Sequence, residues 1–183
     1  MARGANSLIE PIDLSDVEAL FEDLGDAAEA AARPAAQAAA QQLYNAAKAN
    51  VSALGIVKGN LASSIYQAFS QDNSGPGLAT YHVSWNHIKA PHAGLVEYGH
   101  WQRYQVVTTK SGKWVTVAKP ENAGKKKPRQ RASQAEKDAY YMPRQGGPVY
   151  IPGKAFMRRA LSAGPLATQA AAAVLWQALE KVK

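Results

Sequence analysis

The alanine-rich stretch between Asp26 and Leu54 constrains the fold of this 183-residue chain more than any other feature. Alanine favours helix, and Pro34 inside the stretch predicts either a kink or the first turn of a new helix. Alanine faces are small, so they bury area only against a partner that approaches closely. We therefore expect tight helix–helix packing here, or a contact with another subunit.

Helices are also predicted on either side of this stretch. Ser15-x-x-Glu18 fits a capping box at the start of the first one, and Gly25 marks a break or weak point. After a loop at Gly55–Gly59, Asn60 is expected to cap a short helix. Each of these two helices has one apolar stripe: Val17, Leu20, Phe21 and Leu24 in the first, and Leu61, Ile65, Ala68 and Phe69 in the second.

The apolar period then changes to two, which predicts strands. Residues 81–85 alternate as a half-buried strand, with His82 on its polar face. Two further segments, 103–109 and 114–118, are rich in β-branched and aromatic residues and flank a Ser-Gly loop, so they predict a hairpin. A short helix is expected over 92–98, ended by Gly99, and a short strand over 149–151.

Two helices end the chain, divided by Gly164-Pro165. The order of elements predicts an α+β fold, in which N-terminal and C-terminal helices pack on a small, mostly antiparallel sheet. We expect an N-terminal helical segment over 1–55 and an α+β domain over 56–183, with a basic loop at 119–145. No secretory signal is expected at the start, and no apolar run approaches the roughly 20 residues that a membrane-spanning helix needs.

Charge is segregated along the chain, whose formal net charge is +7. Eight of the 14 acidic residues lie before residue 31, against one basic residue, Arg3. Between Arg103 and Arg131 nine basic residues face one acid, Glu121. A solvated surface explains such asymmetry, and so does contact with a polyanion or with the acidic end of another copy. The candidate interface residues are Glu18, Glu22 and Asp23 on the acidic side, and Lys125, Lys126, Lys127, Arg129 and Arg131 on the basic side.

The segment from Pro120 to Pro143 contains almost no aliphatic residues and holds most of this basic charge. We interpret it as a long mobile loop that orders on contact with a partner. Because aromatic residues are not interleaved with its cations, base-specific nucleic-acid reading is not expected, although a non-specific phosphate contact is.

The sequence contains few groups of residues that could form a catalytic site. The chain has no cysteine, which excludes disulfides and thiol chemistry. His92, Glu97 and His100 form a weak zinc candidate without the H-E-x-x-H spacing, so a metal-dependent hydrolase is the least favoured alternative. We expect no enzyme, no cofactor and no metal.

Three stretches in order resemble the family of tailed-bacteriophage tail-completion, or head–tail joining, proteins. Ala47-Lys48 with Gly59–Ile65 is similar to its "A-K … T-G-x-L-x-x-S-I" element, and residues 93–99 (AGLVEYG) to its "A-x-x-V-E-x-G-T". Residues 152–161 (PGKAFMRRAL) are similar to its "P-x-P-F-(L/M)-R-P-A-L". His100, Lys58 and Arg159 depart from the family pattern, and residues 101–150 are longer than typical.

The resemblance implies a virion structural protein of the phage neck. It would form a ring of six copies, with twelve as the alternative, around the DNA channel between head and tail. Neighbouring neck, connector and tail proteins would be its partners, and the host cytoplasm its place of assembly. A tail-terminator-like ring and a small basic DNA-binding protein remain as alternatives.

The motif residues also have simple architectural interpretations. Gly59 is then a loop residue before a capped helix, Gly99 ends a helix beside an exposed Glu97, and Phe156 and Leu161 are core anchors. The full set carried over from the family is Gly59, Leu61, Ile65, Glu97, Gly99, Phe156, Arg158 and Leu161.

Overall fold

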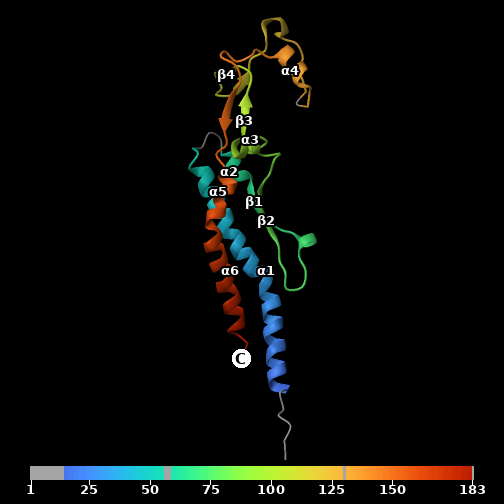
Figure 1. The fold of residues 1–183 in the computed structure, drawn as a ribbon, viewed down its shortest axis with the longest axis vertical. Coiled ribbons are helices and arrows are strands. Elements are labelled where there is room, and N and C mark those ends of the chain that lie inside the picture. Colours follow the sequence, from blue (N-terminus) through green and yellow to red (C-terminus); the bar gives the residue numbers. More distant parts are fainter. Residues whose placement is uncertain (1–14, 56–58, 130, 183) are drawn as a thin grey trace, which may run out of the picture. The chain divides into compact units, whose positions relative to one another are not determined.

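One long helix, α1 (Ser15–Ser52), contains all but the last two residues of the alanine-rich stretch. The computed structural model describes residues 15–55, 59–129 and 131–182. The helix continues through Gly25, so the predicted break there is wrong, and Pro34 also lies inside it. Figure 1 shows the axis of α1 changing direction along its length, as expected of a helix with an internal proline. The predicted loop residues 56–58 and the start of the chain lie outside the described residues.

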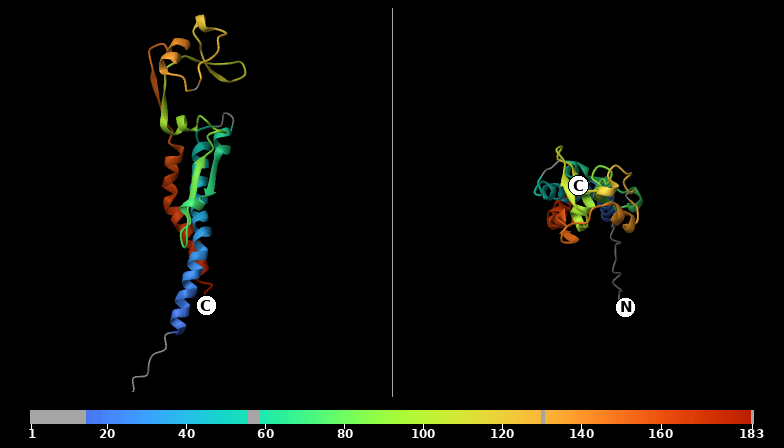
Figure 2. Two further views of the ribbon diagram at one scale, coloured as in Figure 1. Left: turned by 90° about the vertical axis from the view of Figure 1, so that its right-hand side faces the viewer. Right: turned by 90° about the horizontal axis from the view of Figure 1, so that it is seen from above.

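A second helix, α6 (Gly164–Leu179), runs beside α1 (Figures 1 and 2). The buried residues of this pair are mostly alanines, including Ala31, Ala35, Ala47 and Ala167, each less than 9% exposed. Side chains this small let two helix backbones approach closely. The tight helix packing expected of the alanine stretch is therefore confirmed.

A two-stranded antiparallel hairpin lies against α1. It pairs β1 (Ile65–Phe69) with β2 (Tyr81–Trp85), in a register that sets Ile65 opposite Trp85. The predicted strand at 81–85 is confirmed, with His82 exposed. The predicted helix beyond Asn60 is wrong in its second half, because α2 (Asn60–Ser64) ends where β1 begins to pair with β2.

The described residues divide into two units, of which the first consists of residues 15–90 and 157–182. The first unit holds the elements above, a turn at Gln71–Asn73 (η1), all but the first residue of α5 (Phe156–Ala160), and a turn at Leu161–Ala163 (η3).

The second unit, Pro91–Phe156, is built from short elements. Its strands form two further antiparallel pairs, β3–β6 and β4–β5. The predicted hairpin, the strand near residue 150 and the helix ended by Gly99 are confirmed, each within a few residues. The elements are α3 (Ala93–Tyr98), β3 (Gly99–Gln102), β4 (Val106–Thr108), β5 (Trp114–Thr116), η2 (Pro120–Asn122), α4 (Gln134–Tyr140) and β6 (Val149–Pro152).

The α+β class is confirmed. Over the described ranges the strands form three separate two-stranded sheets. No helix in the described part of the chain is both long enough and apolar enough to cross a bilayer.

Candidate functional site

Two of the stretches that suggested a family meet in the second unit. β3 begins at Gly99 and pairs with β6, so that Gly99 lies opposite Pro152. The amide of Lys154 donates a hydrogen bond of 2.6 Å to the carbonyl of Val96, and that of Ala155 donates to the carbonyl of Glu97. Residues more than 50 positions apart therefore form one structural element.

Gly99 is required at this junction for two reasons. Its φ of 84° lies in the left-handed region that favours glycine. A Cβ at Gly99 would also lie 2.6 Å from the carbonyl oxygen of Ile151 and 2.7 Å from the amide nitrogen of Gly153. Both neighbours are backbone atoms, which cannot turn aside as a side chain can. The interpretation of Gly99 as the glycine that ends a helix is confirmed.

The other motif residues divide between buried and exposed positions. Phe156 is fully buried, as expected of a core anchor. Leu161 is 68% exposed, so its interpretation as a core anchor is wrong. Glu97, expected to be exposed, is only 1% exposed, and the chain after β6 passes next to it, where the Ala155 amide donates to its carbonyl. Arg158 is exposed, Ile65 is buried, Leu61 is half-buried, and Gly59, with a φ of 71°, precedes α2.

The basic segment 119–145, here called the basic lobe, has a structure of its own. The expected long loop contains η2 and the helix α4, which begins with a capping box. The amide of Glu136 donates to the Ser133 hydroxyl, and the Ser133 amide donates to the Glu136 carboxylate at 2.8 Å. The spacing Ser133-x-x-Glu136 is a sequence signal from which this helix could have been predicted.

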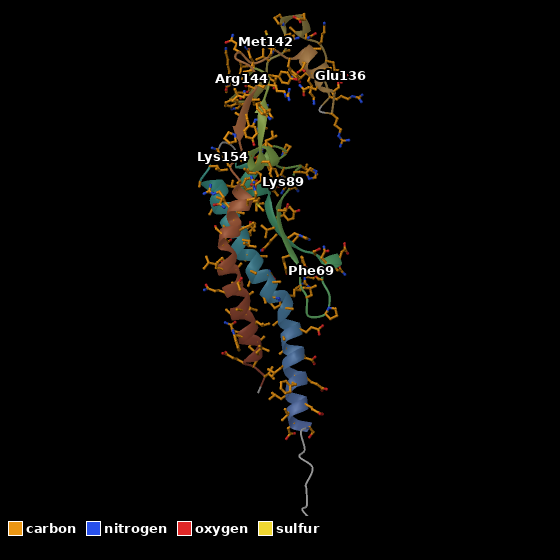
Figure 3. All side chains as sticks on the ribbon, viewed as in Figure 1. Phe69, Lys89, Glu136, Met142, Arg144 and Lys154 are labelled. Atoms are coloured by element: carbon orange, nitrogen blue, oxygen red, sulfur yellow. The ribbon has the colours of Figure 1, made fainter. Side chains whose placement is uncertain are left out.

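Tyr140 and Asn122 connect the two arms of the lobe. The Tyr140 hydroxyl donates to the carbonyl of Lys125 at 2.8 Å, and the Asn122 amide donates to the carbonyl of Ala139 at 3.0 Å. Tyr140 is also the most deeply buried of the described residues of the lobe. Figure 3 labels Glu136, Met142 and Arg144 in this part of the chain.

All five predicted cations of the lobe are exposed. Four of them, Lys126, Lys127, Arg129 and Arg131, line one open hollow of about 760 Å³ together with Asn122, Tyr140 and Glu136. Glu136 is the acid among the described residues that line this hollow, and its carboxylate already accepts hydrogen bonds from Ser133. The hollow therefore presents a net positive surface to an anionic group.

A tyrosine–carboxylate pair joins α4 to the hairpin side of the same unit. The Tyr104 hydroxyl donates to Asp138 at 2.7 Å, and the Gln134 amide donates to both of these side chains. Burial, followed by the hydrogen bond and charge of Asp138, raises the pKa of Tyr104 to about 12. The hydrogen bonds from Tyr104 and Gln134 lower the pKa of Asp138.

The acidic end of the chain lies on α1. Glu18, Glu22 and Asp23 are exposed on its first two turns, as are the apolar residues between them. No basic residue lies between Ser15 and Arg33. The acidic and basic surfaces predicted from the sequence therefore belong to different units, and each is accessible within its own unit.

No three potential metal-binding side chains lie close enough to hold an ion in the part of the chain that the structure describes. This observation gives the zinc candidate His92, Glu97 and His100 no support.

Residues 15–99 match the family model described as "Bacteriophage HK97-gp10, putative tail-component". No curated protein and no solved structure matches the chain. This stretch is a little under half of the chain's length, and over it the chain is similar to the HK97-gp10-like family of phage tail components, which confirms the predicted resemblance. The match includes the first two motif stretches and leaves the third, at 152–161, a prediction.

Proposed function

We propose that this protein is a structural part of the phage neck that forms a ring and joins the head connector to the tail around the DNA channel. The family match over residues 15–99 supports the proposal, because the matching family is described as one of phage tail components. In this role the chain works by shape and converts no substrate. Its partners are copies of itself, six or twelve to a ring, and the neighbouring connector and tail proteins.

The segregated charges support assembly through unlike surfaces. The acidic face of α1 carries Glu18, Glu22 and Asp23, and the basic lobe carries Lys125–Lys127, Arg129 and Arg131. The acidic face of one copy would meet the basic lobe of the next copy, or a basic surface of a connector protein. Charge would then set the register and the rate of assembly. Contacts between two different patches run head to tail, and they close into a ring when the rotation between copies allows it.

The direct test is the native mass of the purified full-length protein together with electron micrographs of the same sample. A ring of six or twelve copies is the expected result. Mass spectrometry of intact virus particles should also detect the protein. A protein that stays monomeric at every accessible concentration, or is missing from the virion, would contradict the proposal. Rings that cap isolated tails and never contact the connector would favour the tail-terminator role.

The hollow of the basic lobe favours a second candidate function, non-specific contact with the genomic DNA. Four cations around one hollow can meet backbone phosphates without reading bases. Duplex binding measured over a salt series tests this candidate. Weak, strongly salt-dependent binding that is lost in a Lys126→Ala, Lys127→Ala, Arg129→Ala variant would support it, whereas salt-independent binding would exclude it.

A further inference from the structure

The first turns of α1 expose an apolar stripe that nothing in the described residues covers. The free end of α1, Ser15–Asp23, is exposed at every residue. Phe21 is 70% exposed, and Val17 and Leu20 are each 46% exposed. Both Figure 1 and Figure 2 show the start of α1 extending past the end of α6, the helix that runs beside a later part of α1.

An apolar groove lies elsewhere in the same unit, between α1, β2 and the α5–η3 segment. It has a volume of about 420 Å³, and among the described residues that line it none is charged. Small side chains such as Ala36 and Ala40 leave room for a bulky one. The groove is also lined by Leu161, a motif residue that is 68% exposed within this chain.

The free end cannot reach the groove of its own chain. Phe21 and Ala36 lie on one continuous helix, fifteen residues apart. At 1.5 Å per residue they are separated by about 22 Å along the axis. A helix cannot fold back onto itself without breaking, so the stripe and the groove can meet only between two molecules.

The negative charge of the free end favours the groove of a second copy as its partner, rather than the free end of a second copy. Six acidic residues and no basic residue lie between Ser15 and Arg33, so like charges would repel two free ends placed side by side. The uncharged groove causes no such repulsion. Arg159 is exposed on α5 next to Ala160, which lines the groove, so positive charge lies close to the groove.

We infer that the free end of α1 of one copy docks in this groove of the next copy, with Phe21 as the anchor. The inference rests on the proposed ring and names the contact that builds it. Helical spacing turns Glu22 and Asp23 away from the stripe, so the acidic face stays available to the basic lobe of a neighbour. The contact joins two unlike patches, as a ring with cyclic symmetry requires.

Because the chain has no cysteine, single cysteines introduced at chosen positions give a specific crosslinking test. A Phe21→Cys protein is mixed with a Leu161→Cys protein at a concentration where rings form, and a short bismaleimide is added. Crosslinked dimers are expected from this mixture. They are not expected from Phe21→Cys mixed with Trp176→Cys, a matched control at a residue that is 65% exposed on α6.

A Phe21→Asp variant supplies the second measurement. We expect it to remain helical by circular dichroism, since Phe21 is exposed, and to require at least about tenfold more protein to assemble. If Phe21→Asp forms rings as well as the wild type does, and the cysteine mixture gives no Phe21–Leu161 crosslink, the inference is overturned and the proposed function stands. Wild-type protein that never forms rings would overturn both.

Two other occupants of the groove give distinct results. If Phe21→Asp leaves the ring intact but abolishes attachment to connectors or tails, the stripe binds another protein and the inference is overturned. If deletion of residues 2–14 dissolves the ring and Phe21→Asp does not, the N-terminal segment is the occupant and the inference is again overturned.

Discussion

The helical pair of the first unit and the basic lobe of the second unit are stabilised in different ways. The buried residues of α1 and α6 are alanines and one valine, so these helices pack through small apolar side chains. The basic lobe buries little apolar surface, and a few side-chain hydrogen bonds from Tyr140, Asn122, Ser133 and Tyr104 hold it together. The comparison shows that one chain can combine a stiff helical body with a charged surface held by individually weak interactions. Changes to apolar packing should therefore cost more stability than changes to the lobe.

The largest effect is expected from Phe156→Ala. Phe156 is the largest fully buried side chain among the described residues, and removing such a ring typically costs about 3–5 kcal/mol. Urea unfolding followed by circular dichroism measures the loss. Leu161→Ala is the matched control from the same motif and should cost far less, because Leu161 is 68% exposed. Equal losses for the two variants would contradict the assignment of Phe156 alone as an anchor.

Ala47→Leu tests the close packing of α1. Ala47 is completely buried, so the added atoms have no space and should destabilise the protein by about 1–3 kcal/mol. Ala49→Leu, two residues along the same helix at an exposed position, is the control and should change stability by less than about 0.5 kcal/mol. A tolerated Ala47→Leu would mean that the helices do not pack as closely as the structure has them.

A smaller, local effect is expected from Ser133→Ala, which removes the capping box of α4. Loss of such a cap costs about 0.5–2 kcal/mol of helix stability. Hydrogen exchange should quicken at the α4 amides while those of α1 keep their protection. Ser111→Ala, in the hairpin loop, should leave α4 unchanged, and a global loss of protection would show that the lobe does not open independently.

The smallest effect is a pH dependence at Tyr104. Its pKa of about 12 lies above the ordinary value of 10.0, so its stabilising contribution is complete below about pH 10 and is lost as the pH rises through about 12. Asp138, whose pKa is lowered, contributes above its ordinary value of 3.8 and loses that contribution as the pH falls below it.

Absorbance of the phenolate at 295 nm checks the first value. The wild-type titration minus that of Tyr104→Phe should show one tyrosine of eight ionising near pH 12. In an Asp138→Asn background the pKa should move back toward 10, because the carboxylate that accepts the hydrogen bond is gone. A Tyr104 pKa near 10 in the wild type would contradict the pair.

Local chemistry alone predicted many of the elements. The alanine stretch, the alternation at 81–85, the Ser-Gly hairpin and Gly99 at the end of α3 are all properties of neighbouring residues, and the structure has each of them. The capping box at Ser133 was equally readable, but the density of charge around it favoured a loop interpretation. The distribution of charge along the sequence also predicted two charged surfaces, one with Glu18, Glu22 and Asp23 and one with the lobe cations. Their roles in assembly remain predictions.

The tertiary structure decided what depends on distant partners. Residues 65–69 fit a helical stripe as well as a strand, and pairing with 81–85 selected the strand. Glu97 is buried and Leu161 is exposed, although the sequence favoured the reverse, because burial depends on which segments fold over a residue. For the same reason, the groove that contains Leu161 could not be read from spacing: its lining comes from α1, β2 and the segment after residue 156, which only the folded chain brings together.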